Sequence, residues 1–173
     1  YKNGGTPPCS QGSLRGRKWS LYEGGIRVPF IAVWPDHIPA GKTNDKAVMS
    51  VVDFIPTLSS LTGVKMPAAY QSDGIDESAV WLDKTNNHPH DLFWYYNNQP
   101  VPGKKEYISP LLAMRSGNWK FLMDPGGANR QLYNLQSDPL ESNNLVTKDP
   151  DRAKKMATQL QEWYDAIVKK NMR

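Results

Sequence analysis

Cysteine is almost absent from this chain of 173 residues, in which Cys9 stands alone. A single cysteine excludes an internal disulfide bond and a zinc site built from cysteine thiolates. The sequence also lacks an Asn-x-Ser/Thr sequon for N-glycosylation, which slightly favours a bacterial source. No run approaches the roughly 20 apolar residues that cross a bilayer, so we expect no membrane span.

The composition that remains is typical of a folded domain. Six tryptophans and eight tyrosines in a chain of this length supply enough large apolar surface for a core, which argues against disorder. The chain begins at Tyr1, without a methionine or a signal-peptide pattern. We therefore expect it to be a piece of a longer protein, whose N-terminal part would be its first partner.

The net charge of +4 is confined to one end of the chain. Residues 1–27 hold five basic side chains and one acidic side chain, whereas residues 28–173 are neutral overall. Proteins that bind nucleic acid usually spread basic residues along a face, so this local excess favours a small anion over a nucleic acid. The alternative is that these are ordinary solvated loop charges.

Two parts with different patterns follow along the chain. In the first, residues 26–34 form a nearly continuous apolar run that predicts a buried strand. Residues 50–63 predict a helix that Asp53 can cap and that Gly63 ends. Phe54, Leu58 and Leu61 would form its apolar face. We place residues 1–91 at the end of a mixed α/β domain.

The second part, residues 92–173, predicts a small antiparallel sheet and a terminal helix. Alternating apolar residues and tight turns indicate four strands, at 92–97, 111–116, 119–123 and 131–134. Asp149-Pro150 is typical of a helix start, and an apolar stripe follows it. The fold class is therefore α/β, with this helix packed against the sheet.

The most informative segment is Leu14-Arg15-Gly16-Arg17-Lys18-Trp19-Ser20-Leu21-Tyr22-Glu23-Gly24-Gly25-Ile26-Arg27-Val28-Pro29. The ammonium group of Lys18 is a compact charge that suits a small tetrahedral anion. The adjacent Gly24-Gly25 predicts a flexible loop that could bring the lysine to the edge of a site. Glu23 and Arg27 are expected to form a structural ion pair.

This segment resembles the sulfatase pattern L-R-G-x-K-x-x-x-x-E-G-G-x-R-V-P. Further resemblances to the family follow in the same order over about residues 12–165, at Ile38-Pro39-Ala40-Gly41, Asp53-Phe54-Ile55-Pro56-Thr57-Leu58, Asp73-Gly74-Ile75-Asp76, Ala113-Met114-Arg115-Ser116-Gly117-Asn118-Trp119-Lys120 and Leu132-Tyr133-Asn134-Leu135 through Leu145. The chain thus resembles the C-terminal part of a type I, formylglycine-dependent sulfatase with the alkaline-phosphatase-like fold.

The resemblance implies a sulfuric ester hydrolase in which Lys18 contacts the sulfate group. It also implies a calcium ion and a formylglycine made from Cys or Ser in C-x-[PA]-x-R, both held outside this chain. Cys9 is followed by a different sequence and is interpreted as an incidental loop residue. We expect no metal ligands within these residues, and no activity from the chain by itself.

The three histidines are weaker candidates. His88 and His90 could line the substrate entrance, but solvated loop positions are the simpler interpretation for both and for His37. Their neighbours in the sequence do not provide acidic or cysteine partners at the spacing of a metal site.

The predicted function is hydrolysis of sulfate esters on a small molecule or glycan. A phosphate or phosphonate monoester hydrolase of the same superfamily and a non-catalytic anion-binding module remain alternatives. The family resemblance implies a periplasmic or extracellular location. A sheet cut from its neighbouring strands would expose an edge, so self-association of the isolated chain is expected.

Overall fold

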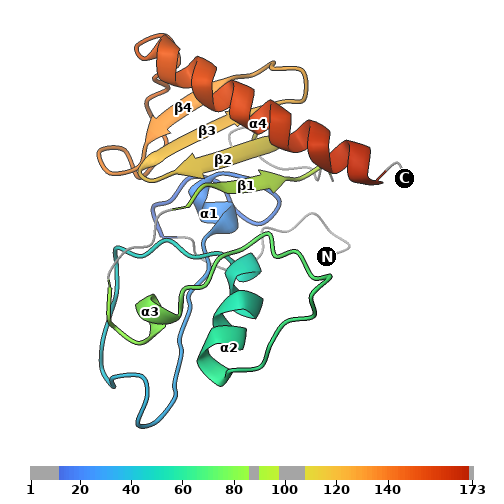
Figure 1. Ribbon diagram of the computed structural model, residues 1–173. Helices are drawn as coiled ribbons and strands as arrows, with labels where there is room; N and C mark the ends of the chain where they lie inside the picture. The colour runs from blue at the N-terminus through green and yellow to red at the C-terminus, as the bar shows by residue number, and fades with distance from the viewer. Residues whose placement is uncertain (1–11, 86–89, 98–107, 172–173) are drawn as a thin grey trace, which may run out of the picture. The chain divides into compact units, whose positions relative to one another are not determined.

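The computed structural model describes residues 12–85, 90–97 and 108–171, with side chains described up to residue 168. It is a mixed α/β structure with one four-stranded sheet (Figure 1). No helix among these residues combines the length and the apolar character that a bilayer span requires.

The chain divides into two compact units. The sheet unit joins Tyr1–Val28 to Asp91–Arg173, and the second unit is Pro29–His90. The sequence predicts that residues 1–91 form one part of the fold. In the structure, residues 12–28 instead belong to the sheet unit, because two of their side chains are part of its hydrophobic core.

The sheet is antiparallel, with the strands in chain order. Its strands are β1 (Leu92–Tyr95), β2 (Leu112–Ser116), β3 (Trp119–Met123) and β4 (Gln131–Asn134). All four lie where the sequence predicts strands. The turn between β2 and β3 places Gly117 at φ 56°, a left-handed conformation that glycine adopts without a steric penalty.

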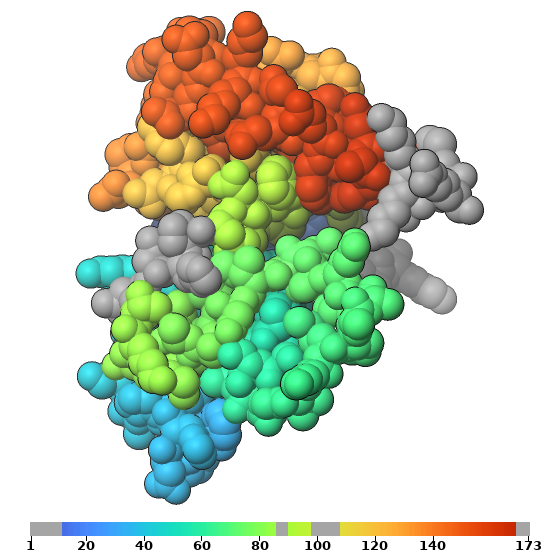
Figure 2. All heavy atoms as spheres, viewed as in Figure 1, coloured from blue at the N-terminus to red at the C-terminus, as the bar shows by residue number. Residues whose placement is uncertain are grey.

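Helix α4 (Pro150–Asn171) covers one face of this sheet (Figure 1). As predicted, it begins directly after Asp149, whose carboxylate accepts a hydrogen bond from the backbone N–H of Arg152 at 3.2 Å. Its apolar stripe packs against β2, β3 and β4 with Ala153, Met156, Ala157 and Leu160 buried. The space-filling view shows α4, in red, lying over the strands of the sheet (Figure 2).

The opposite face of the sheet packs against the segment that contains Lys18. Ala113, Leu122 and Tyr133 point to this face, because side chains alternate along a strand. They contact Leu21 and Tyr22, which are 5% and 1% exposed. Helix α1 (Glu23–Ile26) follows on the same side of the sheet (Figure 1). The sheet therefore has a core on each face.

The helices in the described residues of the second unit are short. They are η1 (Val51–Asp53), α2 (Phe54–Thr62) and α3 (Ser78–Trp81). Helix α2 ends at Gly63, which adopts the left-handed conformation at φ 72°, as the sequence predicts. Phe30, Phe54 and Trp81 contact one another, with ring centroids 5.0–5.6 Å apart.

Two predictions for this region are wrong. Residues 26–34 do not form a strand, and Val28, Ile31 and Val33 are more than four-fifths exposed. A strand needs a hydrogen-bonded neighbour, and no described segment pairs with this one. In α2, Leu58 of the predicted apolar face is 43% exposed, whereas Pro56 and Thr57 are buried instead.

Candidate functional site

Lys18 lies on the surface of the sheet unit, in a loop whose neighbouring residues are buried. Arg17 and Ser20 are only 8% and 4% exposed, and the backbone N–H of Ser20 donates to the carbonyl of Arg17 at 2.9 Å. The Lys18 ammonium nitrogen lies 5.4 Å from the ring centroid of Trp19. No ion pair joins Lys18 to another described residue, so its charge is accessible to a ligand.

The arginines of this segment have structural partners. The Arg15 guanidinium donates to the Tyr133 hydroxyl at 3.0 Å and to the Glu141 carbonyl at 2.7 Å, and it lies 3.8 Å from the ring centroid of Tyr22. Arg27, which is largely exposed, lies 4.0 Å from the Glu23 carboxylate. The predicted Glu23–Arg27 pair is confirmed, but the basic residues hold the loop and do not all converge on one anion site.

Gly24 and Gly25 make this loop tight, contrary to the predicted flexibility. A Cβ atom on Gly25 would lie 2.0 Å from the Ser20 carbonyl oxygen, and one on Gly24 would lie 2.7 Å from the Arg15 carbonyl oxygen. The Gly24 N–H also donates to that Arg15 carbonyl at 2.7 Å. These glycines are therefore required because the backbone folds closely upon itself.

A buried network of charges joins this loop to the sheet. Lys120 is fully buried, and its ammonium nitrogen lies 2.9 Å from Glu23 Oε1 and 3.0 Å from Glu141 Oε1. The Glu23 backbone N–H donates to Glu141 Oε2 at 2.7 Å. The Arg115 guanidinium lies 3.6 Å from Glu23 Oε2. Two acids and two bases thus balance each other where water is excluded.

Strand register explains why these bases meet. Arg115 on β2 pairs with Lys120 on β3, which pairs in turn with Tyr133 on β4. Residues opposite each other in an antiparallel sheet point to the same face. Glu23 therefore meets a cationic row that the sheet has already aligned. Sequence reasoning gave Lys120 and Glu141 no role, although both lie in segments that resemble the sulfatase patterns.

Burial changes the proton affinities in this network. It raises the pKa of the Glu141 carboxyl above its ordinary value of 4.5, although the Lys120 ammonium acts in the opposite direction. Burial likewise lowers the pKa of the Arg115 guanidinium, and the Glu23 carboxylate opposes that shift. The loop that carries Lys18 is thus held by groups whose charged forms are costly to bury and depend on one another.

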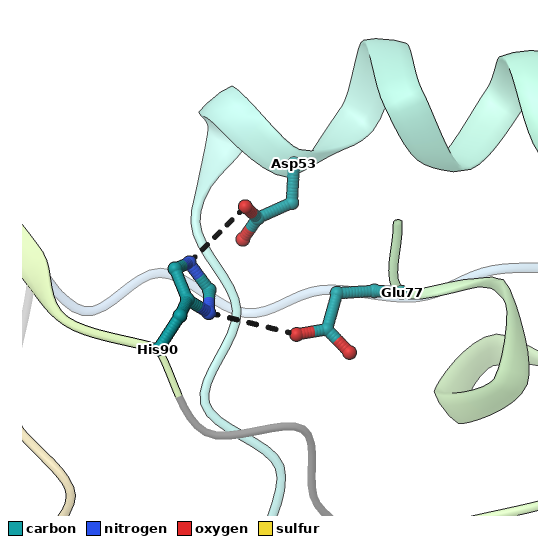
Figure 3. Close-up of side chains that lie close together, drawn as sticks. All are labelled: Asp53, Glu77 and His90. Carbon is teal, nitrogen blue, oxygen red and sulfur yellow. Dashed lines mark ion pairs between the residues drawn. The ribbon is translucent and has the colours of Figure 1, made fainter. Parts of the chain in front are cut away.

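His90 is not a solvated loop histidine, contrary to the sequence interpretation. Its ring lies between the side chains of Asp53 and Glu77 (Figure 3). Nε2 lies 3.2 Å from Asp53 Oδ1, and Nδ1 lies 3.8 Å from Glu77 Oε1. Both carboxylate residues are buried, and the histidine side chain is 15% exposed. This second cluster lies wholly within Pro29–His90.

The other candidates separate from these clusters. His37 is exposed and stacks on Trp34, with the ring centroids 3.9 Å apart, as a solvated loop residue can. His88 and Cys9 lie outside the described residues. Of the two histidines assigned to the substrate entrance, the structure thus describes His90 alone and gives it acidic partners.

A polar hollow of about 680 Å³ lies on the sheet unit. Arg15 and Arg130 contribute guanidinium groups to its lining, and Asn129, Gln131 and Asn144 contribute amides. Arg15 lies in the same tight loop as Lys18. Donors and acceptors in a hollow of this size suit a polar ligand such as a sugar.

The sequence matches the family described as N-sulphoglucosamine sulphohydrolase, C-terminal, over residues 16–170. Human arylsulfatase A is 32% identical over 159 residues, which cover 80% of this chain and 29% of that protein.

Two solved structures extend the comparison. One comes from work on the metabolism of multiple glycosaminoglycans by Bacteroides thetaiotaomicron; it aligns with a TM-score of 0.68 and 25% identity over 90% of this chain and 32% of that chain. The other is Ps i-CgsB in complex with k-i-k-neocarrahexaose, with a TM-score of 0.62 and 28% identity over 83% of this chain and 30% of that chain. The chain spans about a third of the length of these proteins.

Proposed function

We propose that the full-length protein hydrolyses sulfate esters, because this chain belongs to the family of N-sulphoglucosamine sulphohydrolase C-terminal domains and is the C-terminal portion of a sulfatase. The match covers most of the chain, and the described fold is that of sulfatase structures. The chain contributes one binding group to this reaction and the scaffold that holds it.

Lys18 binds the sulfate group of the substrate. The observation that carries this assignment is an exposed ammonium without an ion-pair partner among the described residues, on a loop whose flanking residues are buried. When the S–O bond breaks, negative charge develops on the bridging oxygen that leaves with the alcohol, and a fixed cation that holds the sulfate group nearby stabilises that charge. Lys18 would thus lower the barrier as well as bind the ester.

Glu23, Lys120 and Glu141 act as positioning residues for this lysine. Together with Arg115 they form a network of four charges with contacts of 2.7–3.6 Å, and this network ties the loop to the sheet. A charged group stabilises a transition state most when it is already oriented and needs no rearrangement during the reaction. The loop and the sheet together supply that orientation, while none of these three side chains needs to touch the substrate.

Calcium and the formylglycine nucleophile would come from elsewhere in the full-length protein. Calcium prefers six to eight oxygen ligands, whereas the cluster at His90 includes an imidazole, and so it does not fit this ion. Among the described residues no C-x-[PA]-x-R motif occurs either. We therefore assign this chain no step that involves the metal or the nucleophile.

The substrate is proposed to be a sulfated glycan. Two structural relatives support this class, one from glycosaminoglycan metabolism and one in complex with k-i-k-neocarrahexaose. The polar hollow beside Arg15 is suited to hydrogen bonding with sugar hydroxyls.

Substitution of Lys18 tests the proposal. In the full-length enzyme, Lys18→Ala should lower kcat/KM for a sulfate ester by about 100- to 1,000-fold, the usual effect of removing one charge-stabilising group. Lys65→Ala, which removes another exposed lysine, is the matched control and should leave the rate unchanged. Equal rates in both variants would refute the role of Lys18.

The ester itself provides a second comparison. A phosphate monoester with the same leaving group presents a similar tetrahedral anion to Lys18, so both esters should bind. If the full-length enzyme hydrolyses the sulfate ester faster, the sulfatase assignment holds. Faster hydrolysis of the phosphate ester would replace it with the related monoester hydrolase function.

A further inference from the structure

The cluster of Asp53, Glu77 and His90 brings together three side chains that can bind a metal ion. Asp53 closes η1, Glu77 precedes α3, and His90 ends the second unit (Figure 3). One ligand atom from each residue lies within 4.8 Å of the others. The three segments are far apart in the sequence but converge at one point within a single compact unit.

The two carboxylates are positioned before any ligand arrives. Asp53 Oδ2 accepts the backbone N–H of Ser50 at 2.7 Å, and Asp53 Oδ1 accepts that of Ile75 at 3.0 Å. The backbone N–H of Glu77 donates to the Thr57 hydroxyl at 2.9 Å. Each carboxylate oxygen has more than one lone pair, so Asp53 Oδ1 can still bind a cation.

The histidine provides the observation that points to a ligand. Both ring nitrogens of His90 are buried from solvent, and neither makes a hydrogen bond, although each faces a carboxylate. Buried polar atoms without hydrogen bonds are rare in proteins and call for an explanation. A cation among the three side chains would satisfy one ring nitrogen and offset the charge of the carboxylates.

We propose that Asp53, Glu77 and His90 form a binding site for a divalent transition metal ion, with zinc as the best match. An imidazole combined with carboxylates suits zinc, whereas magnesium and calcium prefer oxygen ligands alone. Ligand atoms on one tetrahedral zinc ion lie about 3.4 Å apart, whereas the three here lie within 4.8 Å of one another, so the side chains would draw together by up to about 1.4 Å when zinc binds. A water molecule would complete the tetrahedron.

The proposed metal site and the proposed sulfate site share no residue. Its three ligands all belong to Pro29–His90, whereas Lys18 and its supporting network belong to the sheet unit. Zinc here would link three segments of a unit that contains only short helices, and so would stabilise that unit. The inference does not depend on the sulfatase activity, and its test measures metal instead of turnover.

The test uses the full-length protein, stripped of metal and then given calcium in excess before zinc is titrated. We expect the wild-type protein to bind zinc with a rise in melting temperature. His90→Gln should weaken this zinc binding at least tenfold. His37→Gln removes a histidine that is exposed and stacked on Trp34, so it should bind zinc as the wild type does.

Glu77→Gln provides a second variant with almost unchanged size. It should also weaken zinc binding at least tenfold, and it keeps the inference testable if His90→Gln does not fold. Two results would overturn the site. If the wild-type protein binds no zinc, the cluster is a structural contact between a histidine and two carboxylates. If both His90→Gln and Glu77→Gln bind zinc like the wild type, the ion lies elsewhere.

Discussion

The two units of this chain bury carboxylates in different ways. In the sheet unit, Glu23 and Glu141 meet Lys120 and Arg115, whose side chains carry positive charge over the ordinary pH range. In the second unit, the Asp53 and Glu77 carboxylates face the imidazole of His90. The first cluster thus pairs carboxylates with permanent cations, whereas the second combines carboxylates with an imidazole, a set of side chains that can bind a metal ion.

The two units also differ in how fully they bury their apolar side chains. The sheet has α4 on one face and the Lys18 loop on the other, so its apolar residues are buried on both sides. In the second unit, by contrast, the apolar side chains of Ile31 and Val33 are more than four-fifths exposed. Rigidity in this chain therefore resides in the sheet unit, which is where a binding lysine benefits from it.

The largest expected effect comes from removing the central cation of the sheet unit. Lys120→Met keeps the length of the side chain but leaves Glu23 and Glu141 buried without their ammonium partner. We expect the free energy of unfolding to fall by about 3–5 kcal/mol. Denaturant titration of the full-length protein would measure this loss.

Two controls sharpen that result. Lys148→Met removes an exposed lysine and should change the free energy of unfolding by less than about 0.5 kcal/mol. Adding Glu23→Gln and Glu141→Gln to Lys120→Met should restore much of the lost stability, since the uncompensated charges are then gone. A small loss of unfolding free energy in Lys120→Met would mean that the buried charge network contributes little to holding the Lys18 loop on the sheet.

A smaller effect should appear in the pH dependence of stability. Because burial raises the pKa of Glu141 above 4.5, the folded state holds this proton more tightly than the unfolded chain does. Its contribution to stability is fully present below pH 4.5 and is lost as the pH rises through the folded-state pKa. In Glu141→Gln, the melting temperature should therefore fall less over this window.

Thermal melts of both proteins between about pH 4 and pH 8 would measure the two slopes. The slope is the informative quantity, since Glu141→Gln also loses its contact with Lys120 and is expected to be less stable throughout. Identical slopes in the two proteins would show that Glu141 is not the titrating group.

The smallest effect on folding is expected in the second unit. Ile31→Lys combined with Val33→Lys replaces two highly exposed side chains, so the melting temperature should stay the same. The pair should, however, reduce self-association of the 173-residue chain, because it breaks an exposed apolar segment. Sedimentation velocity would measure this, and Thr43→Lys, at an exposed polar position, is the control.

Local patterns in the sequence predict the sheet unit well. Alternating apolar residues and the Gly117 turn give the strands, and Asp149-Pro150 gives the start of α4, because these signals act within a few residues. The apolar run at 26–34 was misleading, since a strand depends on neighbours that the run does not specify. A local pattern thus predicts an element only where its partners also lie nearby.

The buried clusters could not be predicted in this way. His90 lies 37 residues after Asp53, and a histidine in a polar segment ordinarily indicates solvent exposure. Lysine is almost never fully buried, so Lys120 gave no signal of its own. The family resemblance identified Lys18 but not the residues that hold its loop, because a sequence motif does not show which side chains contact each other in the fold.

The buried charge network that holds the Lys18 loop also sets an order of events during protein synthesis. Glu23 is made 118 residues before Glu141, the residue that receives its backbone N–H. At about 5–20 residues per second, the ribosome needs roughly 6–24 s to supply that partner. Until then the backbone N–H of Glu23 lacks this buried acceptor, and a message cut short before Glu141 would yield a loop without it.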